Sequence, residues 1–122
     1  GSAMVATEQT LFWKREHGRL MDVAEEGGVL VTPGISECEK RIKNECLERH
    51  LRLIHLQSEP IGKYWKPERM RFGACAAGTL LILAPWAEEL GGDSRHERFH
   101  QLNNLAASIC AIDHHCECKV NE

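Results

Sequence analysis

The chain has 122 residues, of which 43% are hydrophobic, enough for one domain with a modest core but too few for two domains. Its formal charge of −3 and pI near 6.2 exclude the strong positive field with which most nucleic-acid-binding proteins attract phosphate backbones. We therefore expect a single small domain and regard nucleic acid as a possible but disfavoured partner.

The first predicted element is a helix that follows a short N-terminal remnant. Residues 1–4 (GSAM) are typical of what remains after tag cleavage, so we assign them to an expression tag. From residue 7 to about 26 there is no proline, and the apolar residues can share one broad face, which predicts a helix. Gly27 and Gly28 end it.

Three short apolar runs, at 29–32, 51–56 and 79–84, predict strands covered on both faces, as in a parallel sheet. Amphipathic patterns predict helices over 35–50 and about 95–111. Strands separated by helices indicate right-handed βαβ connections. The predicted fold class is therefore α/β, with a small, mainly parallel sheet flanked by helices in a truncated Rossmann-like three-layer domain.

The C-terminal segment, residues 114–122, has no apolar period, so we predict one domain over 5–113 followed by a flexible tail. The sequence contains neither a run of roughly 18 apolar residues nor a signal peptide, which favours a soluble cytoplasmic protein. In that compartment thiols are reduced. We therefore expect most cysteines to be buried small apolar residues, including Cys38, Cys46, Cys75 and Cys110.

The turn between the first strand and the next helix is the main candidate for a ligand site. In an open parallel sheet, ligands bind at the carboxyl ends of the strands, where segments 32–36, 57–59 and 84–86 should meet. Free N–H groups and the helix dipole near Ser36 would suit an anion. However, Ser36 and Glu39 also form a Ser-x-x-Glu capping box, which satisfies the same N–H groups. Phosphate binding and capping alone both stay open, and the pattern favours capping.

A second capping box, at residues 94–97 (SRHE), opens the last helix and predicts capping only.

The connection over residues 58–78 is too long for a plain connector and interleaves basic with aromatic residues. Such residues can hold a nucleotide, or a single strand, by stacking and charge. Alternatively, the aromatic rings pack the loop onto the sheet and the charges face water. The residues concerned are Lys63, Tyr64, Trp65, Lys66, Arg69 and Arg71.

Metal ligands of the right type gather near the C-terminus, but they lack the second, well-spaced pair of a structural zinc site. We predict no metal site; the weak candidates are Cys110, His114, His115, Cys116 and Cys118.

Catalytic patterns are equally weak. Cys75 or Cys38 would have to meet His55 or His100 in space to form a Cys-His hydrolase, and no local pattern supports that pairing. The chain has no Walker motif, no G-x-G-x-x-G and no G-x-S-x-G, so no cofactor is predicted. Paired catalytic carboxylates could come only from glutamates at helix starts and loops, namely Glu37, Glu39 and Glu59.

The segments GVLVTPGISECEKRI, LRLIHLQSE and YWKPERMRFGACAAGTLLILAPW resemble the Rossmann-like core of the DNA-processing protein A (DprA, Smf) group. This group belongs to a superfamily that also holds the cytokinin-activating phosphoribohydrolases. The chain looks most like short bacterial members that share P-x-I-S-x-x-E-K and F-x-x-C-A-x-G-x-L-L-x-L-A-P. The resemblance covers about half of the chain and implies a ligand site at Pro33, Gly34, Ser36, Tyr64 and Lys66.

The chain also departs from that group. It lacks the group's first strand with its Gly-x-Arg-x-x-Ser turn, and the glycine-rich turn has shrunk to Thr-Pro-Gly-Ile-Ser. We therefore expect a non-catalytic module that binds a nucleotide, another phosphorylated ligand or nucleic acid. The predicted ligand-binding residues are Thr32, Pro33, Gly34, Ser36, Lys63, Tyr64, Lys66 and Arg69.

Two alternatives stay open. The first is a phosphoribohydrolase-type enzyme with Glu39 as the catalytic carboxylate. The second is a homodimeric protein-interaction module without a ligand, because a small parallel sheet has two edges to protect.

Overall fold

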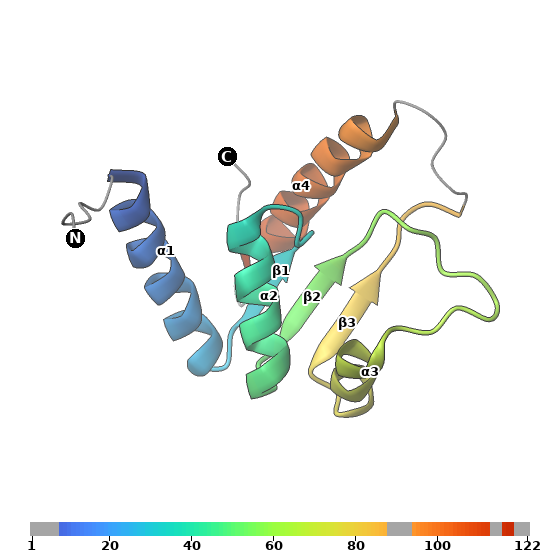
Figure 1. Ribbon diagram of the computed structural model, residues 1–122, viewed down its shortest axis with the longest axis horizontal. Coiled ribbons are helices and arrows are strands. Elements are labelled where there is room, and N and C mark those ends of the chain that lie inside the picture. Colours follow the sequence, from blue (N-terminus) through green and yellow to red (C-terminus); the bar gives the residue numbers. More distant parts are fainter. Residues whose placement is uncertain (1–7, 88–93, 113–115, 119–122) are drawn as a thin grey trace, which may run out of the picture.

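Four parallel strands form the sheet at the centre of the protein. The computed structural model describes residues 8–87, 94–112 and 116–118. The strands are β1 (Val29–Thr32), β2 (Leu53–Leu56), β3 (Leu80–Leu83) and β4 (Cys116–Cys118), in the spatial order β3-β2-β1-β4 (Figure 1). Every neighbouring pair is parallel. Parallel neighbours need a crossover, and helices supply these connections.

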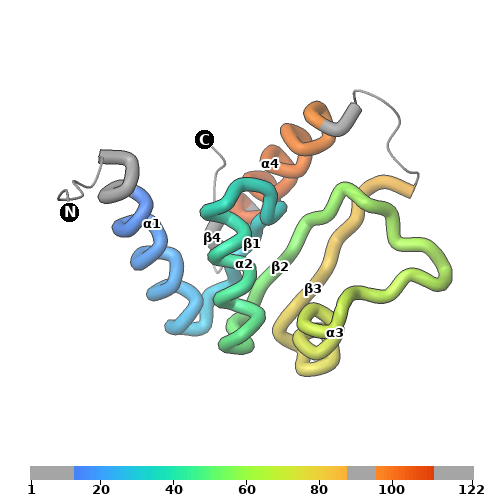
Figure 2. Tube along the Cα trace, viewed as in Figure 1, coloured from blue at the N-terminus to red at the C-terminus, as the bar shows by residue number. Residues whose placement is uncertain are grey.

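Four helices cover the two faces of this sheet. They are α1 (Glu8–Glu25), α2 (Glu37–Arg49), α3 (Arg69–Ala76) and α4 (Ser94–Ile112). The first three pack on one face, and α4 crosses the other face behind β1 (Figures 1 and 2). The domain is thus the predicted α/β fold, a small parallel sheet between helices in a truncated Rossmann-like arrangement.

The core has two parts, because alternate strand residues point to opposite faces of the sheet. On the α1–α3 face, Leu30 and Leu53 pack against Leu20, Ile42 and other buried residues of the helices. On the α4 face, the strands contribute Val31 and Leu56 and the helix contributes Leu102 and Ala106, all buried. The carboxyl ends of β1 and β2 therefore lie between the layer of α1–α3 and the layer of α4.

Most of the predicted elements are confirmed. Strand β1 has the predicted bounds, and α1, α2, β2, β3 and α4 begin and end within about two residues of their predictions. The buried face of α1 includes Leu20, Met21 and Ala24. The capping box at the start of α2 is also present. For α4, the Ser94 side chain lies outside the described residues.

Two elements differ from the prediction. Helix α3 lies inside the segment that the sequence predicts to be a loop, since its glycine and alanines carry no clear amphipathic pattern. Strand β4 lies inside the predicted flexible tail, where Cys116–Cys118 pairs with Val29–Val31 of β1. Three residues are too few for an alternation to be visible in the sequence.

The cysteines only partly match the expectation of burial. Cys46 is fully buried, and its burial raises the pKa of the thiol to about 11. Cys38 and Cys110 are half-buried. Cys75 is exposed on α3, against the expectation of burial. All four are free thiols.

Across the described ranges, none of the helices combines the length and the apolar character needed to cross a membrane.

Packing of α1 on the sheet predicts a large loss of stability when its central side chain is truncated. Leu20 is fully buried among residues of α2 and β1. We expect Leu20→Ala to lower the free energy of unfolding by about 2–5 kcal/mol, measured by urea denaturation, because it leaves a cavity. Lys14→Ala, an exposed change on the same helix, should alter it by less than about 0.5 kcal/mol. Equal effects of the two changes would contradict the packing of α1.

Candidate functional site

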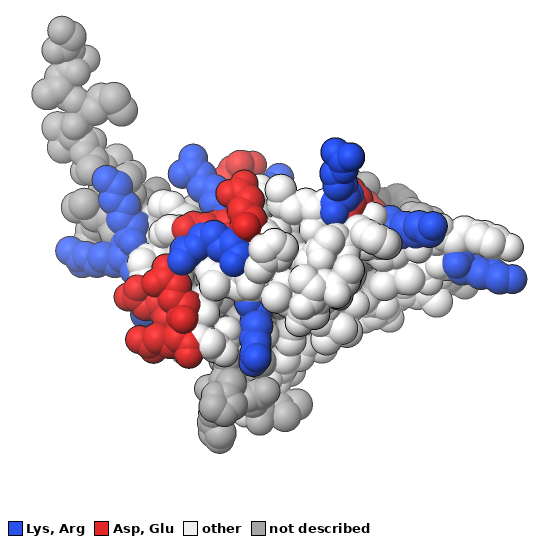
Figure 3. All heavy atoms as spheres, turned by 90° about the horizontal axis from the view of Figure 1, so that it is seen from below, with Lys and Arg blue, Asp and Glu red and all other residues white. Residues whose placement is uncertain are grey.

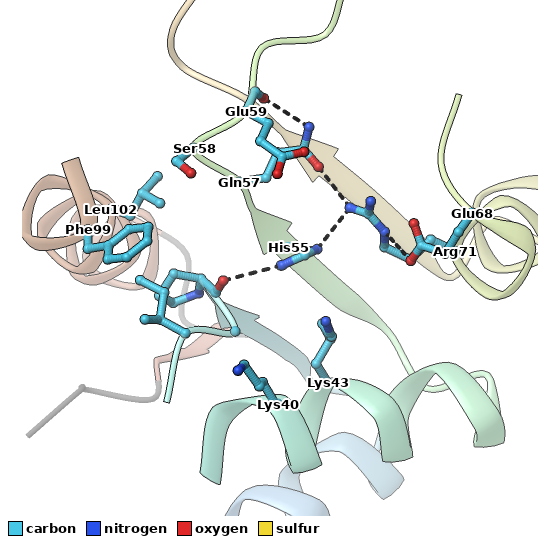
Figure 4. A pocket seen from close by; sticks show the side chains of 13 residues that line it. Lys40, Lys43, His55, Gln57, Ser58, Glu59, Glu68, Arg71, Phe99 and Leu102 are labelled. Atoms are coloured by element: carbon cyan, nitrogen blue, oxygen red, sulfur yellow. Dashed lines mark hydrogen bonds and ion pairs between the residues drawn. The ribbon is translucent and has the colours of Figure 1, made fainter. Parts of the chain in front are cut away.

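A pocket of about 380 Å³ opens where β1 and β2 end, at the edge of the sheet where the sequence predicts a ligand site (Figure 4). Its walls come from the β1–α2 turn, α2, the end of β2, the start of α3, and α4. The lining residues are Pro33, Gly34, Ile35, Lys40, Lys43, His55, Gln57, Ser58, Glu59, Glu68, Arg71, Phe99 and Leu102.

A buried network of hydrogen bonds around Glu39 supports the β1–α2 turn. One carboxylate oxygen accepts a bond from the backbone N–H of Ser36 (3.0 Å), and the other accepts one from the hydroxyl of Thr32 (3.3 Å). The Thr32 hydroxyl in turn accepts from the N–H of Gly34 (3.1 Å), and the Ser36 hydroxyl accepts from the N–H of Glu39 (3.2 Å). Thr32 and Glu39 are fully buried. These hydrogen bonds therefore fix the conformation of the turn.

Gly34 has a backbone conformation that other residues avoid. Its φ is +64°, in the left-handed region. A Cβ atom at this position would lie 3.2 Å from Nε2 of His55 and 3.3 Å from Cδ of Lys43. Glycine thus lets the turn approach the pocket side chains closely.

Arg71 connects α3 to the end of β2. Its Nε donates to the carboxylate of Glu68 (2.6 Å), and its Nη1 donates to Oε1 of Gln57 (2.8 Å). Nη1 also lies 3.2 Å from Nδ1 of His55, and the guanidinium lies over the ring of Trp65. Within the described part of the chain, the side-chain hydrogen bonds of Arg71 come from Nε and Nη1 alone.

His55 is held as a neutral imidazole with a defined tautomer. The carbonyl of Pro33 can only accept, so Nε2, at 3.3 Å, carries the proton, and Nδ1 accepts from Arg71. Burial, together with the charges of Lys43 and Arg71, lowers the pKa of His55 to about 4. His55 therefore adds no positive charge to the pocket near neutral pH.

Two lysines of α2 face the pocket from below the turn (Figure 4). Lys43 is half-buried, and its pKa is lowered by burial and then by the nearby charge of Arg71. It has no ion-pair partner among residues 8–87, 94–112 and 116–118. Lys40 lies one turn earlier and makes only an exposed contact of 3.5 Å with Glu37. An anion that binds here would relieve the repulsion between these cations.

The pocket thus has a cationic side and an apolar side. Lys40, Lys43 and Arg71 supply positive charge; of the two lining glutamates, Glu68 is paired with Arg71, and Glu59 follows the end of β2. Phe99 and Leu102 of α4 form the opposite wall (Figure 4). Such an arrangement can bind an anionic group attached to a less polar body.

The predicted ligand residues divide between the pocket and its surroundings. Pro33 and Gly34 line it, whereas Thr32 and Ser36 support the turn from behind. The remaining four, Lys63, Tyr64, Lys66 and Arg69, are exposed and do not line it. Tyr64 is 86% exposed, so its ring does not pack the loop onto the sheet either.

The expected meeting of three segments is also only partly realised. Residues 33–35 and 57–59 meet at the pocket, but Ala84, Pro85 and Trp86 do not line it. Trp86 instead packs with the α4-side core, under the guanidinium of Arg98.

Sequence reasoning missed two of the three cations that line the pocket. Lys40 and Lys43 belong to the polar side of an amphipathic helix, which predicts only a solvated surface. His55 interrupts the apolar strand run LRLIHL, and the sequence suggests it only as a partner for a cysteine nucleophile. Arg71 is among the loop residues that the sequence suggests for holding a nucleotide, and it lines the pocket.

The described residues contain no cluster of three or more histidine, cysteine or acidic side chains that could hold a metal ion. Of the weak metal candidates, His114 and His115 lie outside the described residues.

Comparison with known proteins adds no assignment. No protein-family model, curated protein or solved structure matches this chain. The resemblance to the DNA-processing protein A group therefore depends on its sequence motifs alone.

The left-handed conformation of Gly34 predicts a specific cost of adding a side chain. We expect Gly34→Ala to lower the free energy of unfolding by about 1–2 kcal/mol in chemical denaturation, because alanine is strained at this φ. Gly62→Ala is the matched control, since its added Cβ would meet no atom within 4 Å and its φ is not in the left-handed region. A cost for Gly62→Ala equal to that for Gly34→Ala would show that the turn imposes no strain.

The neutral state of His55 predicts a pH dependence of stability. Between pH 6.5 and about 4, unfolded His55 takes up a proton that the folded protein does not accept. The free energy of unfolding should therefore fall as the pH is lowered through this window, by up to about 1.4 kcal/mol per pH unit from this group.

The measurement is urea denaturation at several pH values for the parent, His55→Gln and His96→Gln, a change at an exposed histidine of α4. His55→Gln should flatten the pH dependence between 6.5 and 4, whereas His96→Gln should leave it unchanged. Parallel pH profiles for all three proteins would mean that His55 is not kept neutral by the fold.

Proposed function

We propose that this protein is a small, non-catalytic module that binds a phosphorylated small molecule, such as a nucleotide, in the pocket at the carboxyl edge of its sheet. The observation that carries the proposal is the convergence of Lys40, Lys43 and Arg71 beside the Gly34 turn. These three cations come from two different helices, and the pKa of Lys43 is lowered by burial and then by the nearby charge of Arg71. Arg71 is paired with Glu68 and Lys40 contacts Glu37, so a phosphate group would above all supply a counter-charge for Lys43.

The shape of the pocket supports a small ligand over a long polymer. A volume of about 380 Å³ lies in the range of small-molecule sites. Phe99 and Leu102 offer an apolar wall for a base or another weakly polar group, while Gln57 and Ser58 line the rim between the two sides. Lys63, Tyr64 and Lys66, which could have tracked a single strand, lie outside the pocket. These observations favour a nucleotide over nucleic acid.

The geometry favours binding without catalysis. Both oxygens of Glu39 are occupied by the turn, and its side chain is fully buried. A carboxylate in this position cannot reach a ligand, so the phosphoribohydrolase alternative loses its catalytic group. Both nitrogens of His55 are engaged as well.

The proposal keeps a relationship to the DNA-processing protein A group. The motif P-x-I-S-x-x-E-K covers the turn, and its Pro33, Ile35 and Lys40 line the pocket while its Ser36 and Glu39 fix the cap. The motif and the pocket thus fall on the same residues, which supports a ligand-binding origin for this turn.

The proposal predicts that Lys43 is needed for binding. In a thermal-shift screen of nucleoside mono-, di- and triphosphates and inorganic phosphate, at least one nucleotide should raise the Tm by mass action. Lys43→Met should weaken its binding about tenfold or more, which corresponds to about 1.4 kcal/mol for a lost charged hydrogen bond.

Lys66→Met is the control, because it removes the same charge from an exposed residue outside the pocket. Its affinity should match that of the parent protein at equal ionic strength. Binding that is insensitive to Lys43→Met, or a panel in which no nucleotide binds, would overturn the proposed function.

A further inference from the structure

Strand β3 forms one edge of the sheet. It pairs with β2 through Leu80 to Leu83, and in the described part of the structure no strand pairs with its other side. The outward N–H and C=O groups of an edge strand can pair with another strand. This edge lies at the opposite end of the sheet from β4 (Figures 1 and 2).

Strand β3 itself carries neither a charge nor a proline. Protected edges often carry charged side chains, prolines or bulges, but β3 consists of four aliphatic residues, Leu-Leu-Ile-Leu, and the nearest proline, Pro85, follows two residues after it. The uncharged sequence is longer than the strand, since residues 72–87 contain no Lys, Arg, Asp or Glu. By contrast, the central residue of the β4 edge is Glu117.

Exposed apolar side chains lie on both sides of this edge. Leu81 is 52% exposed on the α4 face of the sheet, where α4 packs over β1 and β4. Helix α3 packs against β3 on the other face and exposes Met70 (44%) and Phe72 (55%). These are three of the five large hydrophobic side chains exposed among the described residues.

Figure 3 shows charged side chains mainly at one end and along the upper rim of the view, with further Lys and Arg side chains at the other end. Strand β3 itself carries no charge. The residues of two copies of this strand therefore do not repel each other electrostatically, although the whole chain carries a formal charge of −3.

We propose that the β3 edge is a self-association surface, on which a second copy of this chain pairs its own β3 antiparallel across a two-fold axis. Two-fold dimers are the commonest closed assemblies, and they require a surface that matches itself. An uncharged aliphatic strand can match a second copy of itself in any register in which the corresponding faces of the two sheets stay aligned. The two four-stranded sheets would then form one continuous sheet.

The register of such a pair follows from the alternation of the strand. A two-fold axis perpendicular to the sheet keeps each face continuous, so residues directly opposite each other lie on the same face. Leu81 then faces either Leu81 or Leu83 of the second copy, and both choices bury an exposed aliphatic side chain against another. Helix α3, which exposes Phe72 and Met70, packs against β3 on the other face.

The test is the molar mass in solution, measured by sedimentation equilibrium over a wide range of protein concentration. The parent protein should approach twice the 13.8 kDa of one chain, and Leu81→Lys should raise the dimer dissociation constant at least tenfold by placing a charge at the junction. Ile61→Lys introduces the same charge at a residue with similar exposure (48%) in the 57–68 connection and should behave like the parent protein.

Hydrogen exchange supplies a second measurement on the unmodified protein, in case Leu81→Lys does not fold. Protection of the β3 amides should rise with protein concentration, whereas that of β1 should not change. A parent protein that stays monomeric, a dimer that tolerates Leu81→Lys, or β3 exchange independent of concentration would each overturn the proposal. A monomer that gains β3 protection only with an unrelated partner would also count against self-association.

Discussion

The buried carboxylate of Glu39 is the constraint on which the rest of the site depends. It belongs to α2 but bonds to Ser36 and Thr32, so it ties the end of β1 to the start of the following helix. A carboxylate without water around it requires hydrogen-bond donors, and the turn supplies them only in one conformation. This conformation brings Gly34 into the left-handed region and aims the carbonyl of Pro33 at His55. The cap therefore uses the N–H groups of Ser36 and Glu39, while Pro33 and Gly34 of the same turn line the pocket.

The chemistry of the pocket comes from elements that are distant in sequence. Arg71 reaches the end of β2 from α3, and its bonds to Gln57 and Glu68 join the two elements. Lys43 reaches the same space from α2, and its charge adds to that of Arg71. The neutral imidazole of His55 separates these cations without adding a third charge. Although the whole chain is acidic, positive charge is therefore concentrated at one place, where side chains of α2 and α3 meet at the ends of β1 and β2.

The sequence predicted the architecture well and the site only in outline. Strand β1 and the Ser36 cap follow from local patterns, an apolar run and a Ser-x-x-Glu motif, and the structure confirms both. Helix α3 has weak periodicity and no side-chain cap at Glu68, so its sequence resembles a loop and only packing against β3 and α2 defines it. Lys43 could not be recognised from the sequence, since a lysine on the polar face of a helix becomes part of a pocket only through tertiary contacts. Tyr64 attracted attention because aromatic residues in loops often bind ligands, yet here the ring is exposed to solvent.

The strand order also determines how the domain can assemble during folding. In β1, Val31 pairs with Ile54 of β2, 23 positions later, and with Cys118 of β4, 87 positions later (118 − 31). Closing the longer loop costs about 1 kcal/mol more in chain entropy than closing the shorter one. The β1–β2–β3 unit is therefore the natural nucleus, and β4 joins a sheet that already exists. In the described part of the sheet β4 pairs with β1 alone, whereas β2 pairs with both β1 and β3. An edge strand held on one side is expected to open before a strand held on both sides.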